Sequence, residues 1–183
     1  MTIDREIEYI RQNQKYRRTI FNSIDYGFLM FPIAFIIIGL GGLLGLFPWT
    51  KNEQFILSPI LLTIGIFLFF FFKNRIDHNS KYFELRTAQN QTKNIELTKE
   101  TLEKDIDSRQ IYIDEKNGIV NTTTGFGLTS WGETINVICF DNYVLINSRP
   151  HGYLTIYEDK MNIKRIKEGI TRRIESPAHN SGS

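Results

Sequence analysis

The chain has 183 residues, of which 42% are hydrophobic and 23% are charged, and its formal net charge at pH 7 is +2. These averages conceal two long uncharged stretches, at 26–50 and 54–72, within an otherwise polar chain. Such a division excludes both a simple soluble globule and a disordered chain. The single cysteine, Cys139, excludes a disulfide scaffold and a cysteine-rich zinc site.

The uncharged stretches predict two transmembrane helices. Tyr26–Pro48 is long enough to span, because about 20 apolar residues at a rise of 1.5 Å cross a hydrocarbon core of roughly 30 Å. Phe55–Phe72 is near the minimum length. Only residues 49–54 separate them, which predicts a membrane hairpin with Trp49 at the interface. A buried core hairpin is disfavoured, because the polar remainder is too small to cover two such helices on all sides.

Basic residues flank the predicted hairpin on its two outer ends, whereas the connecting loop holds Lys51 alone. The positive-inside rule therefore predicts that both termini lie in the cytoplasm, at a bacterial inner membrane. The lone cysteine also fits a reducing compartment. The basic residues that decide the orientation are Arg11, Lys15, Arg17, Arg18, Lys73, Arg75, Lys81 and Arg86.

Glycines within the spans predict close helix packing. Gly41 and Gly45 form a small-residue step in the first span, and Gly65 lies in the second. The pattern fits packing within the hairpin, and also fits assembly of several hairpins. Neither span holds an ionisable residue, which argues against a transporter or a proton pump.

The chain divides into four predicted parts: a helical segment at 1–25, the hairpin at 26–73, a cytosolic α+β domain at 74–175 and a flexible tail at 176–183. Isoleucines recur at helical spacing in the first part, with charges between them. That amphipathic segment is expected to lie on the inner leaflet or to pack against the C-terminal domain, and a frayed coil is the third alternative.

The predicted α+β domain is an antiparallel meander of about five or six strands with a closing helix. Turn signals separate the strands at Asn117-Gly118, at Asp141-Asn142 and at 149–152. Apolar residues at helical spacing predict helices over 90–106 and 159–174. The strands are expected at 82–88, 111–122 (a hairpin), 134–140, 143–147 and 153–157. The last helix is basic, so it either closes the sheet or binds a membrane surface.

The residue pattern predicts a protein that is not an enzyme and holds no cofactor or metal. The three histidines are scattered at 78, 151 and 179, and no metal-ligand spacing is present. Cys139 alternates with apolar strand residues, so we interpret it as a buried small hydrophobe. Residues 74–183 carry 15 basic and 15 acidic residues, which argues against a nucleic-acid partner.

A stretch rich in hydroxyls, glycines and aromatics, residues 122–132, is the candidate ligand site. Its hydroxyls could hold a polar ligand, its aromatic rings could stack on a flat one, and an arginine at the next turn could contact an anion. The alternative is an ordinary strand connection with a buried tryptophan. The candidate residues are Thr124, Phe126, Ser130, Trp131 and Arg149.

The tract from Ile119 to Ile146, with Ser130-Trp-Gly-Glu133 midway and Asp141-Asn-Tyr-Val-Leu-Ile146 at its end, resembles bacterial pleckstrin-homology-like membrane proteins. That resemblance implies a β-rich cytosolic domain closed by a helix. The architecture is also similar to the two-span, β-barrel effectors of cyclic-oligonucleotide antiphage signalling, although their sensor is nearly all β.

Two functional hypotheses follow. The first is a membrane-anchored module without catalysis, whose α+β domain binds a protein partner, a second copy of the chain or lipid headgroups at the bilayer surface. The second is a ligand-gated membrane effector, in which a small molecule binds the β-rich domain and the hairpins assemble.

Overall fold

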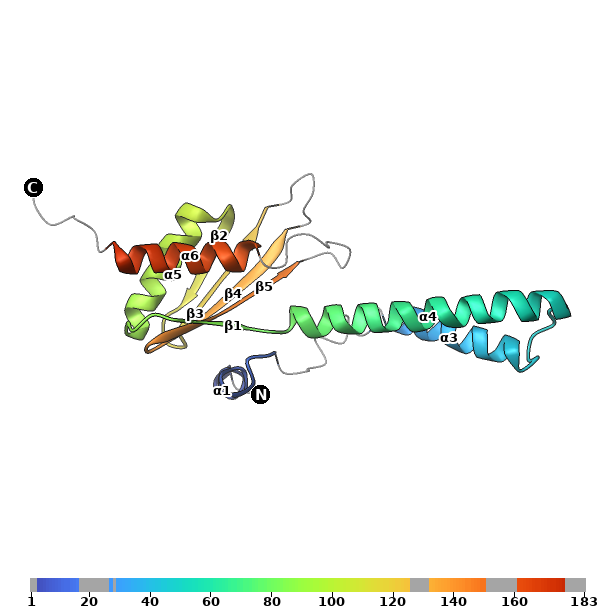
Figure 1. The fold of residues 1–183 in the computed structure, drawn as a ribbon. Helices are drawn as coiled ribbons and strands as arrows, with labels where there is room; N and C mark the ends of the chain where they lie inside the picture. Colours follow the sequence, from blue (N-terminus) through green and yellow to red (C-terminus); the bar gives the residue numbers. More distant parts are fainter. Residues whose placement is uncertain (1–2, 17–26, 28, 126–131, 151–160, 177–183) are drawn as a thin grey trace, which may run out of the picture. The chain divides into compact units, whose positions relative to one another are not determined.

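The computed structural model describes residues 3–16, 27, 29–125, 132–150 and 161–176. These residues fall into two compact units (Figure 1). One unit comprises residues 18–78, and the other joins residues 1–17 to residues 79–183. The N-terminal segment therefore belongs with the C-terminal domain, and the predicted boundaries at 25 and 74 move to 17 and 79.

Unit 18–78 contains two apolar helices, α3 (Met30–Leu43) and α4 (Lys51–Asn79). Within the described residues, α4 alone is both long and apolar enough to cross a membrane, and α3 has 14 residues. At 1.5 Å per residue, α3 is about 21 Å long, which is shorter than a full span. The described residues therefore contain one candidate membrane helix, and the predicted first span, 26–48, includes residues outside the described set.

The loop between these helices differs from its predicted limits of 49–54. Helix α3 ends at Leu43 rather than continuing to Pro48, because Gly45 takes a left-handed conformation with φ of +70°. Helix α4 begins at Lys51 because Thr50 and Glu53 form a reciprocal cap. The Thr50 N–H donates to Glu53 Oε2 at 2.8 Å, and the Glu53 N–H donates to Thr50 Oγ1 at 3.3 Å.

Glycines mark the contact between α3 and α4. A Cβ atom added to Gly39 would lie 2.7 Å from the backbone nitrogen of Leu62. One added to Gly65 would lie 2.9 Å from the backbone nitrogen of Ile36. Gly41 instead faces the ring of Phe47, and Gly45 lies beyond the helix end. The close approach within the hairpin thus uses Gly39 and Gly65, not the predicted Gly41–Gly45 step.

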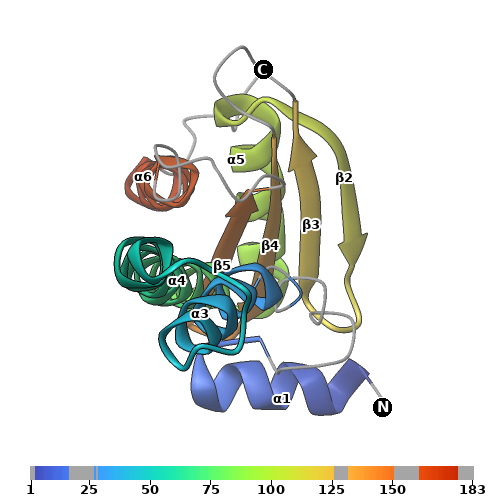
Figure 2. The same cartoon turned by 90° about the vertical axis from the view of Figure 1, so that its right-hand side faces the viewer.

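The other unit is built on a five-stranded antiparallel sheet with the order β1-β5-β4-β3-β2 in the described residues (Figure 2). The strands are β1 (Phe83–Arg86), β2 (Ser108–Asp114), β3 (Ile119–Thr124), β4 (Glu133–Phe140) and β5 (Tyr143–Pro150). Consecutive strands β2 to β5 form the predicted meander, and β1 pairs with β5 at the edge. Strand β5 runs through Arg149 and Pro150, so these two residues are not in the predicted turn. The remainder of that turn, 151–152, and the strand predicted at 153–157 lie outside the described residues.

The turns predicted at Asn117-Gly118 and Asp141-Asn142 both form, and the first of them has a different backbone geometry. At Asn117-Gly118, only Gly118 has a positive φ, of +68°. Asp114 reshapes this loop, because its carboxylate accepts hydrogen bonds from the Asn117 N–H at 3.2 Å and from Asn117 Nδ2 at 2.7 Å. The connection therefore has four residues, 115–118, rather than the two of a type I′ hairpin. At Asp141-Asn142 the two-residue connection is confirmed, with a positive φ at Asn142.

Helices α5 (Gln91–Asp105) and α6 (Met161–Glu175) cover one face of the sheet (Figure 1). Their described bounds lie within two residues of the predicted 90–106 and 159–174. Asn90 caps α5 by accepting the Lys93 N–H at 2.9 Å. The helices meet at Gly169, where an added Cβ would clash with Thr101 at 2.5 Å. The shared core comprises Ile95, Leu102, Val120, Ile135, Val137, Cys139, Val144, Ile146, Ile163, Ile166 and Ile170, with several neighbours.

Helix α1 (Ile3–Asn13) packs on the opposite face of the sheet. Its Ile10 is 3% exposed and forms a second apolar cluster with Ile138 and Leu145. Of the two placements expected for this amphipathic helix, packing against the C-terminal domain is the one observed. Its apolar stripe is therefore occupied by protein contacts, which leaves its charged side toward solvent.

Candidate functional site

The two described residues of the predicted ligand site lie on opposite faces of the sheet. Arg149 is opposite Thr134, which is opposite Thr123, so these three share the face that carries α1. Thr124 follows Thr123 and therefore points to the face that carries α5 and α6. Phe126, Ser130 and Trp131 lie outside the described residues. The described part of the predicted site is thus split across the sheet.

A row of asparagines crosses the centre of the sheet on the α1 face. Asn121 of β3 is opposite Asn136 of β4, and Asn136 is opposite Asn147 of β5. Directly opposed side chains in antiparallel strands have Cβ atoms about 4.5–5.5 Å apart. We call Asn121, Asn136 and Asn147 the asparagine row. Tyr112, which is opposite Asn121, continues it to the β2 edge and is 63% exposed.

Asn147 anchors one end of the row and is 1% exposed. Its Nδ2 group donates to the carbonyl oxygen of Asn79 at 2.9 Å and to that of Lys81 at 2.7 Å. Asn79 is the last residue of α4, and Lys81 is two residues further along the chain. Strand β5 is therefore tied by one side chain to the segment where the long apolar helix ends.

Two carboxamide oxygens of the row are buried without a hydrogen bond from any described residue. These are Oδ1 of Asn121 and Oδ1 of Asn147. A buried acceptor without a donor costs about 1–3 kcal/mol, so native proteins rarely keep one without a use. The row therefore presents acceptors that a donor on a bound molecule would satisfy.

The chemistry available at the row is hydrogen bonding. Carboxamides offer paired donors and acceptors but do not ionise near neutral pH, so they are unsuited to acid–base catalysis. Hydroxyl groups continue the polar surface toward the end of the sheet, with Thr123 and Thr134 in register beside the row. Such a surface suits recognition of a polar ligand or of a backbone with amide groups, and it supplies neither a nucleophile with a base nor a metal-ligand set.

A second polar cluster lies on the α6 side and is built around Glu133, which is 1% exposed. Its Oε2 atom accepts a hydrogen bond from Ser148 Oγ and another from Asn162 Nδ2 at 2.9 Å. Its N–H donates to Thr124 Oγ1 at 2.8 Å. These contacts join β3, β4, β5 and α6 at one end of the sheet, so we assign the cluster a structural role.

Cys139 is fully buried beside Thr98, with Sγ and Oγ1 3.6 Å apart. Burial raises the pKa of its thiol to about 12, against a smaller lowering by the Thr98 hydrogen bond. A thiol in this state is a poor nucleophile. The interpretation of Cys139 as a small core residue is confirmed.

Sequence reasoning missed the asparagine row. Each of its residues lies in a strand at an alternating position, where a polar side chain is normally solvent-facing. The available signal was that Asn147 directly follows the apolar run Val144–Ile146 within one strand, since asparagine is uncommon in strands. Only the strand register places the three carboxamides side by side.

No protein-family model, curated protein or solved structure matched this chain.

Proposed function

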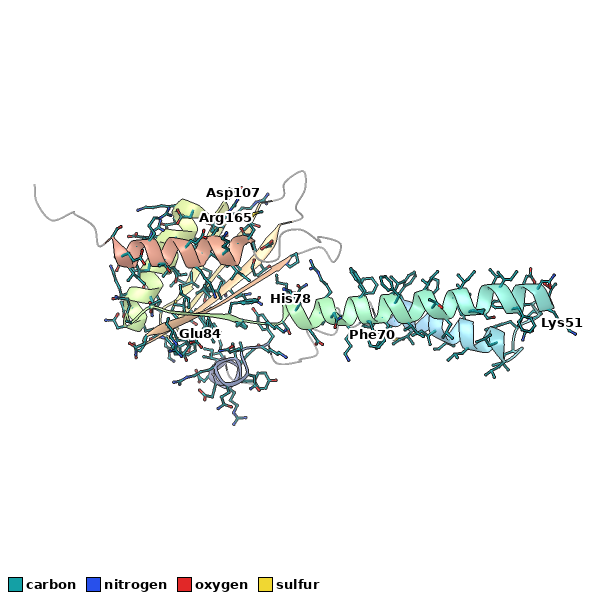
Figure 3. The ribbon with its side chains drawn as sticks, viewed as in Figure 1. Lys51, Phe70, His78, Glu84, Asp107 and Arg165 are labelled. Atoms are coloured by element: carbon teal, nitrogen blue, oxygen red, sulfur yellow. The ribbon has the colours of Figure 1, made fainter. Side chains whose placement is uncertain are left out.

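We propose that this protein is a two-pass integral protein of the bacterial inner membrane, whose cytosolic α+β domain is a non-catalytic binding module. The observation that carries the proposal is α4, which has 29 residues. Only 11% of its most apolar stretch is buried. A core helix of a soluble protein would be mostly buried, whereas this helix exposes large side chains such as Phe55 and Phe67. Phe70 is exposed as well (Figure 3).

The two-pass arrangement is the finer part of the proposal. It is supported by the contact of α3 with α4 through Gly39 and Gly65, and by the absence of charged residues throughout 26–50. The basic residues on the outer flanks favour cytoplasmic termini. The uncharged stretch is long enough to supply the first span, and α3 lies within it.

The binding role is supported by the asparagine row. Its buried acceptors and partly exposed carboxamides suit a hydrogen-bonding partner, which we expect to be a protein or a second copy of the chain. Tethering the domain to the bilayer raises the local concentration of any partner in the same membrane.

Membrane integration is tested by fractionation and by topology reporters. We expect the full chain to stay in the membrane pellet after an alkaline carbonate wash, and reporters fused before Met1 and after Ser183 to be active on the cytoplasmic side. Recovery of the chain in the carbonate supernatant would refute the membrane proposal. A reporter active outside the cell would refute the two-pass orientation.

The binding role is tested by photo-crosslinking in living cells. A crosslinking amino acid at Tyr112, beside the asparagine row, should give a discrete adduct, and Asn136→Leu should weaken that adduct several-fold. The matched control places the same crosslinker at Lys164, which is exposed on α6. Identical adducts from both positions, unchanged by Asn136→Leu, would contradict a binding role for the row.

The second candidate is a ligand-gated membrane effector, and one contact favours it. Asn147 belongs to the row and also holds the backbone at Asn79 and Lys81, where α4 ends. A molecule bound at the row would therefore weaken or strengthen the hydrogen bonds that Asn147 makes to the carbonyl groups of Asn79 and Lys81. Full-length protein in dye-loaded vesicles, challenged with a panel of nucleotides, distinguishes the two. Release of dye that Asn147→Leu abolishes supports gating, and no release with any compound supports the passive module.

A further inference from the structure

The chain segments on either side of the hairpin are joined by a short antiparallel bridge. Lys15 and Lys81 are opposite each other in it. The Tyr16 N–H donates to the Ser80 carbonyl at 3.0 Å, and the Tyr82 N–H donates to the Gln14 carbonyl at 2.8 Å. This pattern makes Lys15 and Lys81 a non-hydrogen-bonded pair, for which the Cα atoms are about 4.5 Å apart and the side chains are closest.

The two lysine side chains share the outer face of this bridge. Tyr16 and Tyr82 occupy the other face, where their rings are 4.9 Å apart and join the apolar cluster under α1. Because neighbouring residues of an extended strand alternate, Lys15 and Lys81 point away from that cluster. Both are exposed, in agreement with this placement.

No described carboxylate lies within ion-pair distance of either lysine. Glu84, whose Oε2 atom accepts a hydrogen bond from Gln14, is paired through Oε1 with Arg86 at 3.2 Å. Like charges directly opposite each other in a β-pair are destabilising. A shared anion between the two ammonium groups would turn this repulsion into attraction.

The position of the pair indicates which anion is available. Lys81 lies two residues after the end of α4, and the uncharged part of α4 ends at Phe72. The seven residues from Phe72 to Asn79 advance the helix by about 10 Å, which brings the chain out of the hydrocarbon and into the headgroup region. Phosphates of anionic lipids are concentrated in that region.

We propose that the Lys15–Lys81 pair binds the phosphate of an anionic phospholipid at the cytoplasmic surface of the membrane. The inference rests on the proposed membrane function and adds a specific ligand class to it. Bound lipid would hold together the segments that enter and leave the hairpin, because one residue of the pair precedes the hairpin and the other follows it. Anionic lipid should therefore stabilise the folded chain, beyond a general attraction of basic residues to the surface.

The test measures thermal unfolding of the full chain in a neutral detergent. Added phosphatidylglycerol should raise the melting temperature by about 2–4 °C, whereas phosphatidylcholine and inorganic phosphate should not. The variant Lys15→Gln/Lys81→Gln should lose this shift. Its control, Lys99→Gln/Lys116→Gln, removes two charges elsewhere and should keep it.

A single charge reversal separates lipid binding from a folding defect. Lys15→Glu creates an ion pair with Lys81, so it should melt above the wild type without lipid and show no response to phosphatidylglycerol. An unchanged lipid shift in the double glutamine variant would overturn the proposal. An equal shift with inorganic phosphate would also overturn it, in favour of a soluble anion. If the chain stays in the membrane fraction but phosphatidylglycerol does not raise its melting temperature, only the lipid site is refuted. If an alkaline carbonate wash releases the chain, the proposed membrane function is refuted.

Discussion

Tertiary contacts set the pKa values of two tyrosines, Tyr16 and Tyr82. The partly buried Tyr16 packs against the buried Tyr82 under α1, although 65 residues of the chain, including the hairpin, lie between them. Burial raises the pKa of Tyr16 to about 12, while a hydrogen bond with Tyr82 and the charge of Arg149 lower it and Glu6 raises it. Burial likewise raises the pKa of Tyr82 well above its usual value.

We expect these tyrosines to make the protein sensitive to alkali. A phenol with a raised pKa in the folded state contributes its full stability below pH 10 and loses it as the pH rises through about 12. In detergent, Tyr16→Phe should flatten the fall in melting temperature above pH 10. Tyr112→Phe, at an exposed position, should keep the wild-type profile. Identical slopes for all three proteins would show that Tyr16 ionises without opening the fold.

At the scale of elements, local signals place most helices and turns. The residue types of the Thr50–Glu53 capping box and of the Asn90 cap indicate helix starts. Thr50 and Asn90 each lie immediately before a helix. Contacts between elements are less readable. Gly41 and Gly45 have the better packing motif, yet Gly39 and Gly65 make the contact, because α3 ends at Leu43 and leaves Gly45 in the loop.

Gly39→Ala should destabilise the α3–α4 pair by about 1–3 kcal/mol. The added methyl group would lie 2.7 Å from the Leu62 nitrogen and 2.9 Å from the Ser58 oxygen, and backbone atoms yield little. Melting in detergent measures the effect. Gly27→Ala is the matched control, because an added Cβ there meets nothing within 4 Å. An unchanged melting temperature for Gly39→Ala would mean that α3 and α4 can move apart at Gly39 without loss of stability.

At the scale of the whole molecule, the domain is completed by a segment that precedes the hairpin. Helix α1 covers Ile138 and Leu145 on one face, while α5 and α6 cover the other. The domain is therefore a three-layer arrangement in which the middle layer is the sheet. A fragment beginning at residue 74 would lack one of these layers.

Ile10→Asp should destabilise the domain by at least about 2 kcal/mol, because it places a charge in the cluster that α1 forms with the sheet. Protease sensitivity of residues 79–183 in the full chain is a suitable readout. Ile3→Asp, at the 49% exposed start of the same helix, should leave protection unchanged. Equal protection in both variants would show that the sheet does not need α1.

The sequence by itself determined the α+β fold class of the C-terminal domain and the approximate positions of most helices and strands. Uncharged stretches, helical periodicity and turn residues are local or one-dimensional signals, so they indicate the apolar helices, α5, α6 and the meander without knowledge of the contacts. The candidate site was only partly accessible in this way: Thr124 and Arg149 were chosen for their chemistry, but strand alternation and register place them on opposite faces.

Only the tertiary structure decided which distant residues meet. The strand register brings Asn121, Asn136 and Asn147 into one row. A backbone bridge pairs Lys15, which precedes the hairpin in the sequence, with Lys81, which follows it. The physical reason is that strand pairing and helix docking are fixed by the burial of whole faces. A residue's partner therefore depends on how all the elements pack, which its neighbours in the sequence do not specify.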